Sequence, residues 1–106
     1  MITEIVSFDR HPGMDRDEMV ADAAGTFERW TDFPGLVRQM FVRDPYSLAT
    51  KGIYLWETLE DADEGLDAAW FERAEAHRGN RPTLERCDCF LILENPGGKI
   101  SECAEG

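Results

Sequence analysis

The stretch from Lys51 to Gly79 constrains the fold more than any other part of the chain, because it predicts a strand that runs almost directly into a helix. Residues 52–57 are rich in the β-branched and aromatic side chains that suit a pleated, half-buried surface. Thr58 then offers a hydroxyl as N-cap, and Asp61 follows three residues later, as in a capping box. Gly65 and the acids around it predict a break, so the second half of the stretch is the better helix, and the final glycine is a natural stop.

Two further elements are expected before this stretch. Ile2–Phe8 is short and strongly apolar, which predicts the first strand, and turn residues follow it. Asp15 is predicted to cap a helix, with Glu18 completing the capping box, and apolar residues recur at helical spacing as far as Trp30. We therefore expect an amphipathic helix that lies on the core.

The remaining strands complete a sheet. Leu36–Asp44 is predicted to be a strand, and the short polar turn Pro45–Thr50 joins it to residues 52–57 as an antiparallel hairpin. Leu84–Glu94 is predicted to be the last strand. We expect Lys99–Gly106 to be a polar tail that is mobile or lies across a partner subunit.

The order of these elements is β-α-β-β-α-β, which predicts an α+β chain with the ferredoxin-like fold. One domain is expected over residues 1–95, followed by a C-terminal tail over residues 96–106. The two crossovers place both helices on one face of a four-stranded antiparallel sheet. Because nearly every strand carries apolar residues on both faces, the uncovered face would expose a large apolar patch. We therefore expect a homodimer that packs sheet to sheet.

The charge of the chain limits its partners. Its 22 acidic and 11 basic residues give a net charge of −11, and the basic residues are scattered along the sequence, which argues against binding to nucleic acid. No run approaches the ~20 apolar residues of a membrane span, and the first residues lack the pattern of a signal peptide. We expect a cytoplasmic protein that does not bind membranes.

The three cysteines, Cys87, Cys89 and Cys103, lack the density of a disulfide scaffold and the spacing of a thiolate metal site. Alternation along a strand puts the first two on one face, where we expect them to be small buried hydrophobic residues. The sequence holds no Ser-His-Asp array, phosphate loop, Rossmann turn or established metal-ligand spacing. No metal or cofactor is expected.

Four segments together resemble the YdhR-like group of dimeric α/β-barrel proteins, which is described as a group of monooxygenases. They are Phe-x-x-x-Pro-Gly-Met at residues 8–14, Gly-Ile-Tyr-Leu-Trp-Glu at 52–57, the helix end at 70–79 and Phe-Leu-Ile-Leu-Glu-Asn at 90–95. The resemblance covers about residues 1–95 and implies a homodimeric barrel with a small apolar pocket between helices and sheet in each protomer. In the anthrone-oxidising relatives it implies chemistry without metal or flavin, in which the deprotonated substrate itself reduces oxygen.

Three residues are candidates for catalysis. His77 is predicted to be a pocket base or hydrogen-bond donor, although a histidine in the last turn also interacts favourably with the helix dipole. Arg38 lies on a mainly apolar strand face, where it must meet a ligand anion or a structural acid such as Asp88 or Glu57. Tyr54 could donate its hydroxyl to a substrate carbonyl.

Aromatic side chains are the candidates for a flat substrate-binding pocket, with core packing as the alternative for each. These candidates are Phe27, Trp30, Trp56 and Trp70.

Two functions of different classes remain open. One is a cofactor-independent oxygenase acting on a small phenolic or quinone-like compound. The other is a non-catalytic homodimeric protein that binds a small ligand or is related to stress. If His77 and Arg38 point into a common cavity of ~300 Å³ or more, the oxygenase is favoured. If both point to solvent or to a carboxylate, the non-catalytic function is favoured.

Overall fold

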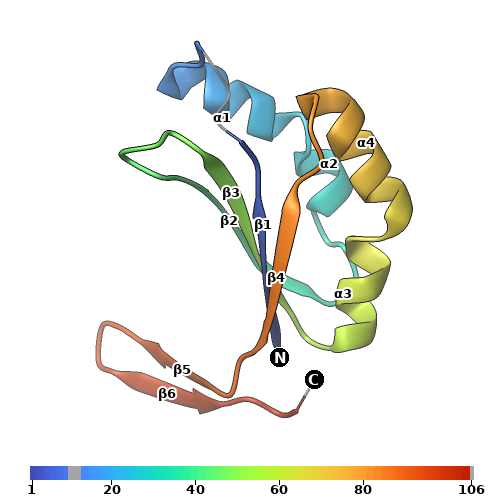
Figure 1. Cartoon of the computed structure of the whole chain (residues 1–106). Helices are drawn as coiled ribbons and strands as arrows, with labels where there is room; N and C mark the ends of the chain where they lie inside the picture. Colours follow the sequence, from blue (N-terminus) through green and yellow to red (C-terminus); the bar gives the residue numbers. More distant parts are fainter. Residues whose placement is uncertain (10–12, 106) are drawn as a thin grey trace.

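The structure is a computed structural model that describes residues 1–9 and 13–105. Its main layer is a four-stranded antiparallel sheet with the spatial order β2-β3-β1-β4 (Figure 1). The strands are β1 (Ile2–Ser7), β2 (Leu36–Arg43), β3 (Thr50–Trp56) and β4 (Thr83–Asp88). The helices are α1 (Arg16–Ala24), α2 (Phe27–Trp30), α3 (Leu59–Gly65) and α4 (Ala68–Arg78). They lie on one face of the sheet, which confirms the predicted α+β, ferredoxin-like fold.

The predicted helix starts and the predicted break are confirmed. The Asp15 carboxylate accepts a hydrogen bond from the backbone N–H of Glu18 at 2.8 Å and caps α1. The Thr58 hydroxyl accepts one from the N–H of Asp61 at 3.1 Å and caps α3. The chain breaks after Gly65, and α4 ends at a glycine in the left-handed conformation.

The first predicted helix differs from expectation in its length and its packing. Instead of continuing to Trp30, α1 ends at Ala24, because the Thr26 hydroxyl and the N–H groups of Gly25 and Thr26 bind carbonyl oxygens of the last turn. None of the α1 side chains is buried. The expectation that this helix lies on the core is therefore wrong, and its apolar side faces a cavity.

The core lies between the sheet and the other helices, and aromatic rings dominate it. The rings of Tyr54 and Trp56 stack with their centroids 6.0 Å apart, and the Trp30 ring meets both at steep angles. Gly65 allows α3 to approach this cluster, since a Cβ there would lie 2.1 Å from the Trp56 ring. The buried apolar residues are Ile2, Val6, Trp30, Tyr54, Trp56, Ala62 and Leu66.

One carboxylate is buried among these apolar neighbours. Glu4 on β1 is fully buried, and its Oε2 accepts hydrogen bonds of 2.9 Å from Nε and Nη2 of Arg86 on β4. Arg86 also contacts Asp63 at 3.0 Å. Burial raises the pKa of the Glu4 carboxyl, and the Arg86 guanidinium opposes this rise. The sheet therefore contains a polar contact that the apolar pattern of the first strand did not indicate.

The C-terminal region contradicts two expectations. The strand expected over Leu84–Glu94 stops at Asp88, and residues 91–94 form β5 (Leu91–Glu94). This strand pairs with β6 (Lys99–Glu102), so the residues expected to form a polar tail are part of a hairpin. Gly97 and Gly98, both with positive φ, supply the turn that reverses the chain.

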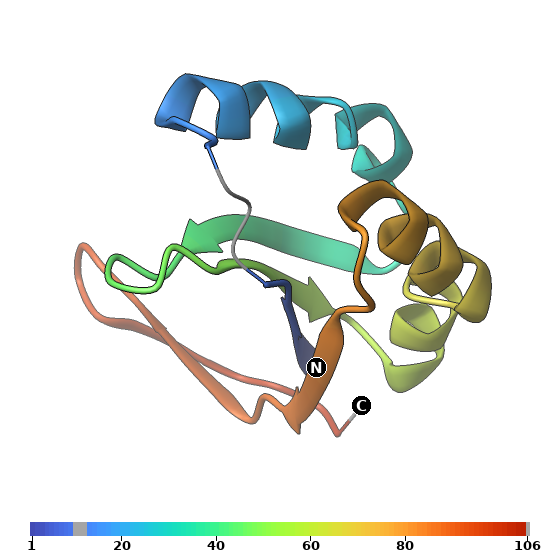
Figure 2. The same cartoon turned by 45° about the horizontal axis from the view of Figure 1, so that its top comes forward.

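This hairpin extends away from the helices, on the other side of the sheet (Figure 2). Its base is tied to the start of the chain, because Met1 donates to the Ala104 carbonyl at 2.7 Å and its own carbonyl accepts from the N–H of Cys89 at 2.8 Å. The sheet face beneath it carries exposed apolar side chains such as Met40 and Val42.

The cysteines form no disulfide. Cys87 is exposed, so the expectation of a buried hydrophobic residue is wrong there, while Cys89 and Cys103 are half-buried. The alternation of β4 places Cys87 opposite Thr3 on the sheet face without helices. In the described residues no helix is long and apolar enough to cross a membrane.

Candidate functional site

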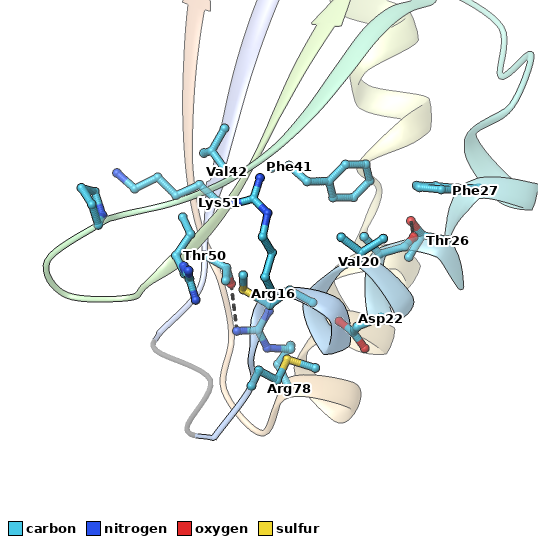
Figure 3. Close-up of a pocket in the computed structure, with 16 residues that line it drawn as sticks. Arg16, Val20, Asp22, Thr26, Phe27, Phe41, Val42, Thr50, Lys51 and Arg78 are labelled. Carbon is cyan, nitrogen blue, oxygen red and sulfur yellow. Dashed lines mark hydrogen bonds between the residues drawn. The ribbon is translucent and has the colours of Figure 1, made fainter.

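A cavity of about 600 Å³ separates α1 from the ends of β2 and β3 (Figure 3). Its apolar walls come from Met19, Val20 and Ala23 on α1, and from Phe27 and Phe41 beyond them. The cavity exists because α1 stands off from the sheet instead of packing on it. An apolar cavity with a few polar groups is the usual form of a small-molecule site.

The two phenylalanines close one end of the cavity. Phe27 begins α2 and Phe41 lies on β2, and their ring centroids are 5.8 Å apart with a tilt of 59°. Both are about half exposed, which leaves ring surface for contact with a ligand. This pair is therefore suited to bind a flat apolar group.

Strand alternation decides which sheet residues face α1. On β3, Thr50 and Gly52 share the face of the buried Tyr54, and the neighbouring β2 residues are Arg43 and Phe41. The lack of a side chain at Gly52 makes room for the Tyr54 ring, since a Cβ there would lie 3.1 Å from that ring. Figure 3 shows Val42 and Lys51 pointing away from α1, so their main chain is what lines the cavity.

Arg78, in the last turn of α4, is held in place at the cavity wall. Its Nη2 donates to the Thr50 hydroxyl and to the Asp9 carbonyl, each at 3.0 Å. Its guanidinium also lies 4.5 Å from the centroid of the Phe8 ring. Burial lowers the pKa of Arg78, but an arginine so placed remains charged.

Asp22 contributes a carboxylate to the wall, from the side of α1 nearest α4. Its Oδ1 lies 3.0 Å from Nε2 of His77, and this contact connects the two helices. The His77 side chain is 68% exposed. The pair therefore links the cavity wall to solvent through two groups that can exchange a proton.

No protein-family model matches the chain, and no curated protein matches it in sequence. Among solved structures, it is similar to a protein from Caulobacter crescentus CB15 described as a "putative antibiotic biosynthesis monooxygenase". That likeness has a TM-score of 0.59 and 17% identity over 83% of this chain and 88% of the other. The two proteins share a fold.

A second solved structure, SnoaB, a cofactor-independent oxygenase from Streptomyces nogalater, is more distant. Its TM-score is 0.45, with 20% identity over 81% of this chain and 84% of that one. The narrower resemblance to the YdhR-like group stays a prediction.

Of the residues predicted to bind substrate, Phe27 lines the cavity. Trp30 and Trp56 lie in the core, and so does Tyr54, which was predicted to act in catalysis. Trp70 is half-buried, with its ring 6.5 Å from Phe8 and 5.1 Å from Phe71. Core packing, the alternative given for each tryptophan, describes their surroundings.

His77 and Arg38 do not share a cavity. Arg38 lies on the sheet face away from the helices, 3.9 Å from Glu94 of the hairpin, whereas His77 contacts Asp22 on the helix side. Because each meets a carboxylate, the criterion stated above favours the non-catalytic function for this pair. Glu94 was not foreseen as the partner of Arg38, since that contact depends on the hairpin.

Sequence reasoning missed most of the polar residues of the cavity, namely Arg16, Asp22, Arg43, Thr50 and Arg78. One signal was present, because Phe41 and Arg43 share a strand face in the predicted pattern. Among the described residues, no group of three or more His, Cys, Asp or Glu side chains could hold a metal ion. His11 lies outside the described ranges.

Proposed function

We propose that this chain binds a small aromatic compound, phenolic or quinone-like, in the cavity beneath α1 and oxidises it with molecular oxygen without a cofactor. The observation that carries the proposal is the cavity itself, about 600 Å³ in volume, with apolar walls and a carboxylate beside them. The fold shared with the Caulobacter protein supports this class of reaction, because a monooxygenase activity is suggested for that protein.

In the proposed reaction, Asp22 takes a proton from an activated methylene carbon of the substrate. Asp22 is suited to this role because it lines the cavity and contacts His77, through which the proton passes to solvent. The guanidinium of Arg78 favours the negative charge that develops on the substrate. Arg38 and Tyr54 have no part in this scheme, since neither lines the cavity.

The chemistry balances without a further reductant. The electron pair left on carbon passes to oxygen, a C–O bond forms, and one proton completes a hydroperoxide. Loss of the second hydrogen from that carbon and cleavage of the O–O bond then give a ketone and water. One methylene group and one O₂ thus yield one carbonyl and one H₂O.

The proposed functional unit is a homodimer joined through the sheet face away from the helices. Exposed apolar side chains on that face and on the hairpin support it, among them Met40, Val42, Leu91 and Leu93. A second copy of the chain presents the same apolar surface of sheet and hairpin, and the two surfaces would cover each other.

A non-catalytic homodimeric protein that binds a small ligand is the second candidate. The observation that favours it is the placement of His77 and Arg38, each beside a carboxylate and on opposite sides of the sheet. In this case the cavity would bind its ligand without changing it.

Oxygen uptake by the purified, metal-free protein with anthrones, naphthols and hydroquinones distinguishes the oxygenase from the non-catalytic protein. We expect uptake above the uncatalysed rate with the anthrones, which carry the methylene carbon that the scheme oxidises, and Asp22→Asn is expected to lower it about 100-fold or more because the proton acceptor is lost. His77→Ala is expected to lower it less, because Asp22 can still pass its proton to water.

Asp17→Asn is the matched control, since it makes the same change on α1 outside the cavity lining. If wild type binds these compounds but consumes no oxygen, the second candidate replaces the first. If Asp22→Asn and Asp17→Asn have equal rates, Asp22 has no part in the reaction.

A further inference from the structure

Positive charge gathers at the cavity of an otherwise acidic chain. The chain has a net charge of −11, yet three arginines, Arg16, Arg43 and Arg78, line the cavity together with one acid, Asp22. Figure 3 shows Arg16 extending from α1 toward β2. A cleft of one sign with apolar walls concentrates ligands of the opposite sign.

None of these arginines forms an ion pair with the described part of the chain. Within residues 1–9 and 13–105, the ion pairs closer than 4 Å involve Arg38, Arg81 and Arg86, and none of the three cavity arginines. The carboxylate of Asp22 is itself in contact with His77. The cavity therefore keeps an excess of positive charge.

Arg78 has the geometry of an anion-binding group. The hydrogen bonds of its guanidinium to Thr50 and Asp9 both use Nη2, and the Phe8 ring supports the plane. Fixing the guanidinium in advance reduces the entropy lost when a ligand binds. The two N–H groups of Nη1 form no hydrogen bond within the described residues, so they can donate to a ligand oxyanion.

The surroundings of Arg78 give a second reason. It is partly buried between α4 and the sheet, and burial disfavours its charged form. A charge removed from water costs free energy unless an opposite charge compensates it. The carboxylates of Asp22 and Asp9 offset part of this cost from beyond ion-pair distance, and a ligand anion would offset more of it.

We propose that the ligand of this cavity is an aromatic compound carrying a stable oxyanion, a carboxylate or an equivalent ionised oxygen group, which Arg78 binds. The aromatic body packs against Phe27 and Phe41, and Arg16 and Arg43 add attraction at longer range. This inference takes its location from the proposed function, but it holds whether or not the ligand is then oxidised.

Two probes that share the same naphthalene ring system, 2-naphthoate and 2-naphthamide, test it by calorimetric titration. We expect 2-naphthoate to bind about tenfold or more tightly than the neutral amide, the size of effect typical of a charged hydrogen bond. Arg78→Gln is expected to remove most of this preference and to leave binding of the amide within about twofold. Added salt is expected to weaken binding of 2-naphthoate more than that of the amide.

Arg73→Gln is the matched control, because it removes the same charge from an exposed position of α4. Arg78→Lys keeps the charge but loses the fixed guanidinium that bonds Thr50 and Asp9, and an affinity for 2-naphthoate between those of wild type and Arg78→Gln is expected. Should both Arg78 variants fail to fold, the preference of wild type for 2-naphthoate over the amide still tests whether the cavity binds an oxyanion.

Equal binding of 2-naphthoate and 2-naphthamide, or of neither, would overturn the inference. Equal weakening by Arg78→Gln and Arg73→Gln would also overturn it, since only net charge would then matter. Selective binding of 2-naphthoate without oxygen uptake would contradict the oxygenase and leave this inference standing. Uptake with neutral anthrones that Arg78→Gln does not change would contradict this inference and the role given to Arg78 in the reaction, and would leave the oxygenase activity itself standing.

Discussion

At the scale of single residues, buried polar groups shape the interior beside the cavity. Tyr54 is almost fully buried, and burial, with a smaller contribution from the charge of Glu4, raises the pKa of its hydroxyl well above the ordinary value. Tyr54 is therefore protonated throughout the neutral range and acts as a core aromatic residue. A raised pKa of this kind makes stability depend on pH.

The sign of this dependence follows from the two states. Above about pH 10 the unfolded chain loses the Tyr54 proton while the folded chain keeps it. The contribution of the Tyr54 hydroxyl to the free energy of unfolding is present below pH 10 and is lost as pH rises toward the folded-state pKa. Wild type should therefore lose about 1.4 kcal/mol of unfolding free energy per pH unit from this group.

Tyr54→Phe is expected to remove that part of the slope, measured by urea unfolding between pH 9 and 11. Tyr46→Phe is the control, because the Tyr46 side chain is 94% exposed and should leave the slope unchanged. If Tyr54→Phe keeps the wild-type slope, the hydroxyl ionises as readily in the folded state as in the unfolded one.

At the scale of elements, two glycines mark the helix breaks for different reasons. Gly25 has right-handed dihedral angles, and an added Cβ would meet one backbone oxygen, that of Asp22, at 3.3 Å. Gly65 faces Trp56, and an added Cβ would lie 2.1 Å from its ring. Only the second glycine is required by packing between a helix and the sheet.

Gly65→Ala is therefore expected to destabilise the protein by about 1–3 kcal/mol, because the core must move to admit a methyl group. Gly25→Ala, the control, is expected to change stability by less than about 1 kcal/mol. Chemical unfolding of both variants measures the difference. A Gly65→Ala protein as stable as wild type would mean that α3 does not pack closely against Trp56.

The sequence predicted elements whose causes are local. Caps at Asp15 and Thr58 and the break at Gly65 depend on neighbours a few residues away, and all three are confirmed. The packing of α1 was mispredicted, because an amphipathic pattern does not say whether its apolar side meets a core or a cavity. The hairpin of β5 and β6 was missed because its second strand is short and mostly polar.

The difference between local and long-range causes also explains how little of the candidate site was predicted. Phe27 was found because aromatic residues are few and conspicuous. Arg78 was not, because its position depends on Thr50 and Asp9, which are 28 and 69 residues away in sequence. His77 was singled out from its helix, but its contact with Asp22 spans 55 residues and needs the tertiary structure.

At the scale of the whole molecule, the two faces of the sheet carry different surface features. The helix side holds the cavity and its arginines, and the other side carries apolar residues of the sheet and hairpin. Oxidation and association would thus use opposite faces. A change on one face should leave the other intact.

Two copies of this 12.1 kDa chain would have a mass of 24.2 kDa (2 × 12.1), and sedimentation at micromolar concentration is expected to give that value. Met40→Glu is expected to shift the protein toward the monomer, since a charge on the apolar face opposes its burial. Leu59→Glu, an exposed position on the helix side, should remain dimeric. A monomeric wild type would contradict the dimer.

The most direct test of the central claim, that the cavity beneath α1 is the ligand site, is amide chemical-shift mapping with 2-naphthoate. We predict that shifts concentrate at 16–27, 41–43 and 50–52 and at Arg78, the segments that line the cavity. Shifts confined to β5, β6 and the sheet face without helices would place ligand binding elsewhere. That result, or no shifts at all, would contradict the account.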